Sequence, residues 1–475
     1  MIRNALSREF ARRGGEGREP DRHATALSRI GRNLGWIAGS RGFAGLVSIA
    51  YMALAARTMG PAGFGIFALI LTYGQLIANL VQFQSWKGVI RYGAIHMTED
   101  RPDRLARLFG FSATLDIGSA LVGSLLAILT MPIIGPLIHL TVEEQNTAAL
   151  FGAVLLLTTG ATPTGILRLY DRFDMLAFTD AIGPIVRVIG SVIGWWLVLD
   201  VRWFLLVWAL AAILQAAGQW FAALVLQRAK LKIGRNAFRQ TLQENRRIWR
   251  FMLMTNLSSS LSLFWLQSGT LAVGGWAGPV EAGGFRIAHR FARAIIKPVE
   301  TITRALYPEL ARLVAEDDHK TLRKLFIRVC LVAALFASVV VLATGLAGRE
   351  ILHLIAGKKF EFAYVFFFLL SISTAIDLAG FALEPFHNAH GRAGRVLRCR
   401  VVGAIVYVAL LALLLPMFGA RGAAFAAIAA SLVIFVQLAH STLQILAKSE
   451  RVRSDPADVD EDLRGSSNRF REELE

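Results

Sequence analysis

Cysteine and charge are both scarce in this sequence. Two cysteines, Cys330 and Cys399, occur in 475 residues, which excludes a disulfide framework. Charged residues make up only 18% of the chain and hydrophobic residues 55%, which is too apolar for a soluble protein of this length. We therefore expect an all-α polytopic membrane protein.

Recognisable cofactor motifs are also missing. The sequence has no Walker loop, no dinucleotide-binding fingerprint and no nucleophile elbow, so we expect no bound ATP and no other cofactor. His387 and His390 lie three residues apart, but no cysteine or third histidine accompanies them, and we expect no metal site.

The excess of positive charge is distributed in a regular way. The formal net charge is +17, which alone would suggest nucleic acid as a partner. The basic residues instead form short clusters between apolar runs, as in 86–108, 227–249 and 309–324, whereas 131–147 contains few cations. This alternation is the positive-inside pattern. It predicts no nucleic-acid partner, a location in the cytoplasmic membrane, and both termini in the cytoplasm.

Long apolar runs dominate the rest of the chain. Between a basic tail (1–33) and a polar tail (448–475), both expected to be disordered, we predict twelve transmembrane helices. The arginines of the first tail suit contact with anionic membrane lipids. The predicted segments are 34–56, 63–85, 109–130, 147–167, 179–199, 203–226, 250–275, 284–307, 325–346, 362–386, 400–418 and 421–445.

An internal repeat relates the two halves of the chain. Gly60-Pro61 joins the first two segments, and Gly278-Pro279 joins the seventh and eighth, 218 residues later. The stretch 199–202 precedes the sixth segment as 418–421 precedes the twelfth, at an offset of 219. We therefore predict two pseudo-symmetric six-helix lobes, 34–226 and 250–447, joined by a basic linker at 227–249 and arranged around a central cavity.

One predicted helix, 284–307, carries an unusual row of charge. The spacing of its charged residues is four, three, four, three and four, so they share one face over roughly 27 Å. An unpaired cation at bilayer depth costs about 2.5–3.5 kcal/mol, so this face should meet water or an anion. The alternative is an amphipathic helix lying flat on the membrane. The charged residues are Arg286, Arg290, Arg293, Lys297 and Arg304, with Glu300 between the last two.

Neutral polar residues on other helices complete the predicted substrate site. Gln75, Asn79 and Gln82 form a stripe on the second segment, and Gln267 lies in the seventh. Such side chains are suited to sugar hydroxyls in a wet cavity. The alternative is that they only form hydrogen bonds between helices.

Other charges lie inside predicted spans. Arg41, Asp116 and Arg187 are each roughly 10–12 Å from the cytoplasmic end of their helices, which suggests a buried pair or triad with a structural or coupling role. Asp377 and Glu384 in the tenth segment are similar candidates.

Several short motifs resemble a known family. The stretches 56–69 (ARTMGPAGFGIFAL), 306–310 (LYPEL) and 416–424 (PMFGARGAA) are similar to those of oligosaccharide and polysaccharide flippases in the multidrug/oligosaccharidyl-lipid/polysaccharide (MOP) exporter superfamily. The resemblance implies a transporter, not an enzyme, that moves undecaprenyl-diphosphate-linked oligosaccharides to the outer leaflet by alternating access. It also implies lipid-linked oligosaccharide and polysaccharide polymerase machinery as partners. Gln267 stands where many relatives have an aspartate.

Two rival functions are weighed against this interpretation. A multidrug or cation antiporter on the same scaffold would need intramembrane carboxylates, whereas the predicted interior is positive overall. A polysaccharide polymerase or ligase would need a substantial outer loop with catalytic groups, and the outer connections at 131–147 and 347–361 are short.

Overall fold

The computed structural model describes residues 22–226, 232, 234–316 and 318–454. Within these ranges it consists of helices and connecting turns, without a β-strand. The expected tails and the basic linker therefore lie partly outside the described residues. The parts that are described, 22–33 and 448–454, are helical rather than irregular, because α2 begins at Arg22 and α15 ends at Ser454 with no proline to interrupt either run.

The helices follow the predicted order of segments. The first half contains α2 (Arg22–Val81), α3 (Ser85–Thr98), α4 (Pro102–Leu137), α5 (Val142–Leu157), α6 (Ala161–Leu169), α7 (Phe173–Trp196) and α8 (Val201–Val225). The second contains α9 (Arg235–Glu244), α10 (Ile248–Ala315), α11 (His319–Ala356), η1 (Lys358–Ala363), α12 (Tyr364–Ala379), α13 (Leu383–Ala389), α14 (Ala393–Phe418) and α15 (Ala420–Ser454).

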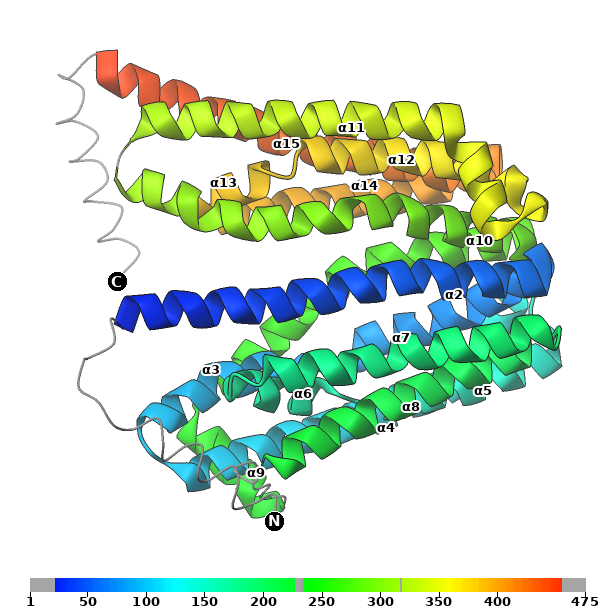
Figure 1. The fold of residues 1–475 in the computed structure, drawn as a ribbon, viewed down its shortest axis with the longest axis horizontal. Coiled ribbons are helices and arrows are strands. Elements are labelled where there is room, and N and C mark those ends of the chain that lie inside the picture. Colours follow the sequence, from blue (N-terminus) through cyan, green and yellow to red (C-terminus); the bar gives the residue numbers. More distant parts are fainter. Residues whose placement is uncertain (1–21, 227–231, 233, 317, 455–475) are drawn as a thin grey trace.

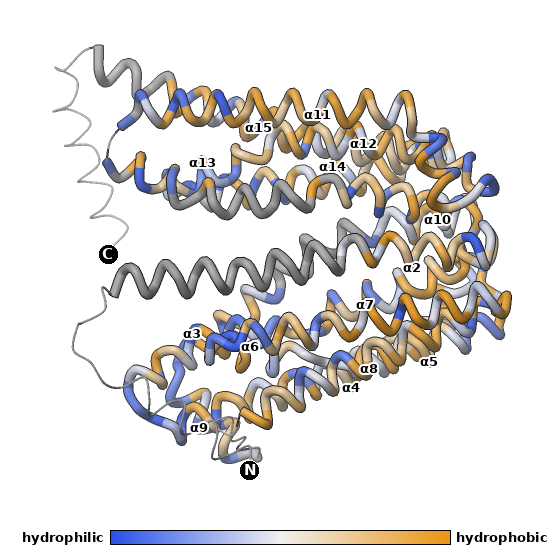
Figure 2. Tube along the Cα trace, in the orientation of Figure 1, coloured by the Kyte–Doolittle hydropathy of each residue, from blue (hydrophilic) through white to orange (hydrophobic). Residues whose placement is uncertain are grey.

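The protein is a multi-pass membrane protein. Nine helical stretches among the described residues are long and apolar enough to cross a bilayer. Large apolar side chains of α4 and α11, such as Leu129, Ile133, Leu335 and Leu346, are exposed on the outside of the bundle, as lipid contact requires. Figure 2 shows the hydrophilic residues gathered toward the ends of the helices and the hydrophobic ones between them. The count of twelve spans stays a prediction.

The two longest helices bend at equivalent glycines. Gly60 in α2 has φ 66° and ψ −178°, and Gly278 in α10 has φ 87° and ψ 176°. These angles favour glycine, and the proline that follows each one would in any case deprive the helix of an N–H donor. Each long helix thus consists of two legs that meet at a sharp turn, as the repeated Gly-Pro pair in the sequence suggested.

A second backbone signature supports the repeat. The end of α6 is closed by hydrogen bonds from Arg172 N to Leu167 O (2.8 Å) and from Asp171 N to Arg168 O (3.1 Å). The end of α13 is closed in the same way by Arg392 N to His387 O (2.9 Å) and Gly391 N to Asn388 O (3.1 Å), 220 residues later. Both are Schellman motifs with a positive φ at the same position, Asp171 and Gly391. The fourth helix of each half is therefore broken and capped alike.

α2 and α10 lie side by side at the centre of the bundle (Figure 1). α4, α5 and α8 lie on one side of this pair, and α11, α12 and α15 lie on the other. We call the end that contains Gly60 and Gly278 the kink end, and the end at which α2 begins and α15 ends the terminal end. At the kink end the two turns touch: a Cβ on Gly65 would overlap the Pro279 carbonyl oxygen, and one on Gly283 would lie 2.9 Å from the Gly65 Cα.

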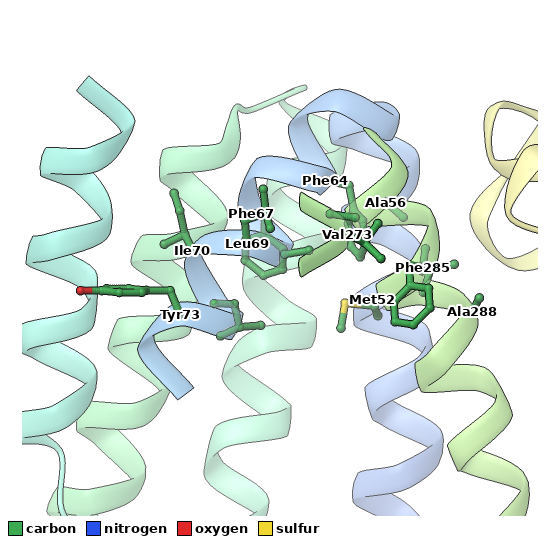
Figure 3. Packing of buried hydrophobic residues seen from close by; sticks show 14 of the residues in the cluster. Met52, Ala56, Phe64, Phe67, Leu69, Ile70, Tyr73, Val273, Phe285 and Ala288 are labelled. Carbon is green, nitrogen blue, oxygen red and sulfur yellow. The ribbon is translucent and has the colours of Figure 1, made fainter. Parts of the chain in front are cut away.

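Apolar packing differs between the two ends. One large core joins both halves near the kink end, where Phe64 and Phe360 meet edge to face with ring centroids 5.7 Å apart. Figure 3 shows part of this core, with Phe64 and Phe67 of α2 near Val273 and Phe285 of α10. Toward the terminal end there are two separate cores. The one around Phe109 joins the first half to the start of α10 through Ile248 and Met252. The one around Phe386 joins the second leg of α10 to α11, α13, α14 and α15. Among the described residues, the second leg of α10 and α11–α15 therefore share a core with the first half at the kink end only.

Candidate functional site

Arg286 is the centre of a buried polar cluster. Its Nη1 donates to Thr72 Oγ1 (3.0 Å) and to Gln267 Oε1 (2.8 Å), and its Nη2 donates to Gln75 Oε1 (2.9 Å). Gln267 Nε2 in turn donates to Gln75 Oε1 (3.2 Å). Arg286 is 8% exposed and Gln267 is 7% exposed. Three helical legs thus meet here: the second leg of α2 and both legs of α10.

The partners of Arg286 satisfy its N–H groups but do not neutralise its charge. These three acceptors are neutral amide or hydroxyl oxygens, and no ion pair among the described residues includes Arg286. Hydrogen bonds from neutral groups orient a guanidinium well, but the positive potential around it persists in a low-dielectric interior. The cluster therefore presents a fixed, positively charged surface to whatever lies beside it.

Arg290 continues this surface one helical turn further along α10. Its Nη2 donates to the hydroxyl of Tyr51 in the first leg of α2, at 3.2 Å. Its Nε is buried without a hydrogen-bond partner among the described residues. Arg293, on the same face, lies within electrostatic range of Asp377 of α12, which is itself hydrogen-bonded to Ser431. His289 is adjacent to the row and stacks on Phe285 at 6.4 Å.

The leg of α10 that carries this row is a packed interior helix. Ile287, Ala288 and Ala292 on its other faces are fully buried in the core between α2 and α12. A helix lying flat on the membrane would leave one of these faces outside the bundle. The structure therefore argues against the interfacial alternative. Lys297 and Arg304 lie further along this helix, but their side chains lie outside the described residues, as does that of Arg41.

The expected contact between Asp116 and Arg187 is not formed. Asp116 is 1% exposed, and its Oδ2 accepts hydrogen bonds from the backbone N (2.8 Å) and the Oγ1 (2.7 Å) of Thr162, at the start of α6. Depth along a helix was the only basis for the pairing, and it does not specify the direction in which a side chain points. One carboxylate oxygen is thus bound at a helix N-terminus, which is a favourable environment for an anion, while Oδ1 is buried without a hydrogen-bond partner among the described residues.

Arg187 points toward aromatic rings. Its guanidinium carbon lies 5.9 Å from the ring centroid of Tyr51 and 5.4 Å from that of Trp208, within the range of cation–π attraction. It thereby approaches the same tyrosine that Arg290 contacts. The prediction that Arg187 pairs with the carboxylate of Asp116 was wrong. Arg187 lies instead against Tyr51 and Trp208, beside the cationic row.

The remaining predicted residues are distributed between the site and the scaffold. Gln82, directly after the end of α2, donates to the Leu156 carbonyl oxygen of α5 at 3.2 Å, so it connects two elements as the structural alternative suggested. Asn79 is half-buried on the same leg. Glu384 forms a bidentate pair with Arg400 (2.8 Å for each bond), away from the Arg286 cluster.

Sequence reasoning missed Thr72 and Tyr51. Thr72 could have been found, because it lies three residues before Gln75 and extends the polar stripe with helical spacing. Tyr51 had no such signal, since a single tyrosine in an apolar run is usually an ordinary core residue.

Comparisons with known proteins agree with this architecture. The family model described as "Polysaccharide biosynthesis protein" matches residues 30–314, more than half of the chain. The inner membrane protein YghQ of Escherichia coli (strain K12) is 31% identical over 346 residues, covering 71% of this chain and 96% of YghQ.

Solved structures of two kinds of transporter share the fold. An inward-facing multidrug resistance MATE family transporter of the MOP superfamily matches with a TM-score of 0.67 and 13% identity, covering 85% of this chain and 96% of that one. The lipid II flippase MurJ, in an inward closed conformation, matches with a TM-score of 0.65 and 12% identity, covering 87% of this chain and 89% of that one. The chain therefore belongs to the polysaccharide biosynthesis protein family and has the fold of MOP-superfamily transporters.

Proposed function

We propose that this protein is a flippase that moves an undecaprenyl-diphosphate-linked oligosaccharide from the inner to the outer leaflet of the cytoplasmic membrane by alternating access. The oligosaccharide would be a repeat unit of a cell-surface polysaccharide or lipopolysaccharide. The single observation that carries the proposal is the buried guanidinium of Arg286, held by three neutral oxygen acceptors.

The charge of the site indicates an anionic substrate. Arg286 and Arg290 are fixed on one helix face, and no ion pair among the described residues involves either of them. A diphosphate would supply the missing negative charge, and guanidinium groups bind its oxygens in a directed, fork-like manner. In the sequence, Lys297 and Arg304 continue the row toward the terminal end, where they would guide the anion.

The amides of the cluster suit the sugar part of such a substrate. Gln75 and Gln267 each offer donors and acceptors, and sugar hydroxyls need both. Asn79, one turn from Gln75, would extend this surface. The lipid tail would stay in the bilayer beside a lateral opening, so the polar site need not accommodate it.

The asymmetry of the packing suggests how the substrate gains access. Both halves share one core at the kink end, whereas at the terminal end the second leg of α10 and α11–α15 have a core separate from that of the first half. We infer that the terminal end faces the cytoplasm, with both termini on that side, and that this conformation receives substrate from the inner leaflet. The kink-end contacts would part when the two lobes rock about the central cavity.

The rival functions fit the site less well. A multidrug or cation antiporter would bind a cation, but arginines form the surface described here. A polymerase or ligase would need catalytic groups, and the structural relatives reported above are transporters. Polymerase machinery and anionic lipids fit the proposal better as partners of the flippase.

Deletion of the gene, followed by mass spectrometry of the extracted lipids, tests the proposed function. The deletion strain should accumulate a diphosphate-linked oligosaccharide, and wild-type protein should remove it. Arg290→Gln with Arg293→Gln should fail to do so while inserting normally, because removal of a charge eases insertion. Arg→Lys at these positions should rescue only partly, since a point charge replaces a fork.

A matched control is available in Arg202→Gln. Arg202 is an exposed arginine that pairs with Glu143 at the kink end, far along the chain from the cationic row. This variant should export normally. Absence of any accumulated lipid-linked glycan in the deletion strain, or normal export by the double variant, would refute the proposed function.

A further inference from the structure

Tyr51 is contacted by arginines from both halves of the protein. Arg290 of α10 donates from Nη2 to its hydroxyl at 3.2 Å, and Arg187 of α7 lies 5.9 Å from its ring centroid. The tyrosine is 3% exposed and packs edge to face on Trp208, with ring centroids 5.1 Å apart. Tyr51 is therefore a buried, well-packed side chain that lies between two arginines 103 residues apart in the sequence.

The three side chains lie at one level of the membrane. Tyr51 is nine residues before Gly60, Arg187 is nine residues before the end of α7 at Trp196, and Arg290 is twelve residues after Gly278. At 1.5 Å per residue these positions are roughly 14–18 Å from the kink end. This is near the middle of a bilayer, where a cation is least well solvated.

Both arginines have hydrogen-bonding capacity left over. The Nε of Arg187 and the Nε of Arg290 are buried, and neither has a hydrogen-bond partner among the described residues. In the same part of the chain, no ion pair includes either residue. The aromatic faces of Tyr51 and Trp208 offset part of the charge of Arg187 but cannot accept its Nε–H in the plane of the guanidinium. The two like charges on either side of Tyr51 also repel each other.

We propose that Arg187 and Arg290 form a two-sided anion site across Tyr51, in which one arginine binds each phosphate of a diphosphate. The inference rests on the proposed function. It adds a second side to the substrate site, formed by Arg187 from the first half of the chain. A diphosphate diester carries one negative charge on each phosphate, so the two guanidinium groups match it in number. Tyr51 acts as a positioning residue because its hydroxyl occupies Nη2 of Arg290 and leaves Nε and Nη1 of that residue for the ligand.

Arg187 and Arg290 lie on α7 and on the second leg of α10, which belong to separate cores at the terminal end. Without an anion, repulsion between Arg187 and Arg290 favours their separation. A bound diphosphate would reverse the sign of this interaction and pull α7 and α10 together. Binding would then favour closure of the terminal end, which is the step that commits a substrate to transport.

Binding of inorganic pyrophosphate to the purified full-length protein tests this site. Affinity is measured by isothermal titration calorimetry in detergent at constant ionic strength, for wild type, Arg187→Gln, Arg290→Gln and the double variant. Each single change should weaken binding at least tenfold. The double variant should lose less than the product of the two single effects, because both residues hold the same ligand. Arg187→Lys should be intermediate, since it keeps the charge but loses the fork.

The outcomes separate this inference from the proposed function. If Arg290→Gln weakens binding and Arg187→Gln does not, the two-sided site is wrong while the flippase proposal stands. If the wild type binds no pyrophosphate, the two-sided site is wrong, and the export assay described above decides the flippase proposal separately. Arg202→Gln should bind as wild type does, and far-UV circular dichroism with size-exclusion chromatography establishes that each variant is folded. If Arg187→Gln fails to fold, the pyrophosphate affinity of Arg187→Lys is measured in its place. An affinity equal to that of the wild type would contradict the two-sided site.

Discussion

The guanidinium of Arg57 donates from Nε to the backbone carbonyl oxygen of Ile355, at 3.1 Å, and so joins the two halves of the protein at the kink end. Its Nη2 also donates to the carbonyl oxygen of Leu354. Both acceptors belong to the last turn of α11, whose carbonyls have no partner within the helix and carry partial negative charge. The residue therefore caps a helix of the second half from a helix of the first.

We expect Arg57→Gln to favour opening at the kink end, because a neutral, shorter side chain cannot hold both carbonyls. A cysteine placed at Ala282, which is fully buried beside Gly283, reports this opening through its rate of thiol labelling in a background without Cys330 and Cys399. Labelling should become several-fold faster. Arg202→Gln at the same end serves as the control, since its pair with Glu143 lies within the first half. Equal labelling in all three backgrounds would show that Arg57 does not hold the halves together.

The close contact of the two glycine-rich turns predicts a position-specific effect of added volume. Gly65→Ala places a Cβ against the Pro279 carbonyl oxygen, and backbone atoms have little freedom to yield. We expect a loss of about 1–3 kcal/mol in stability, as for other overpacked sites. Gly118→Ala is the matched control, because nothing lies within 4 Å of its added Cβ and alanine favours a helix. Thermal unfolding should show Gly65→Ala below wild type and Gly118→Ala at or above it; a reversed order contradicts the prediction.

Substitutions of Asp116 test whether its carboxylate stabilises the fold or takes part in transport. Asp116→Ala would leave the N–H and the hydroxyl of Thr162 buried without their acceptor, which costs roughly 2–3 kcal/mol. We therefore expect a lower yield of folded protein by fluorescence-detected size-exclusion chromatography. Asp116→Asn keeps an oxygen acceptor and should retain most of the yield. If the alanine variant folds as well as wild type, the structural role is wrong, and loss of export in a well-folded asparagine variant would assign Asp116 to ion coupling.

The orientation of the chain in the membrane is open to a direct test. The basic connection between α8 and α10 and the Gly278 kink should lie on opposite sides. A reporter fused after Gly234 should read cytoplasmic and one fused after Val280 periplasmic, as judged by paired alkaline phosphatase and green fluorescent protein fusions. The same compartment for both fusions would overturn the twelve-helix arrangement.

The helical segments, the repeat and the cationic row were all predictable from the sequence. A bilayer core requires long apolar runs whose backbone groups bond internally, so each span is visible as a local pattern. The Gly-Pro pairs at Gly60 and Gly278 are equally local, because the backbone angles at each turn depend on the residue itself. The row from Arg286 to Arg293 follows from helical periodicity alone.

Tertiary structure alone decided which side chains meet. Asp116 and Arg187 have similar depth, yet one binds Thr162 and the other lies over Tyr51 and Trp208. Gln75 and Gln267 were each expected in the site, but their joint contact with Arg286 depends on how α2 and α10 cross. The rotation of a helix about its axis and its crossing angle are set by packing over the whole bundle. Local sequence patterns specify the depth and the face of a residue, whereas its partner is determined only when the helices pack.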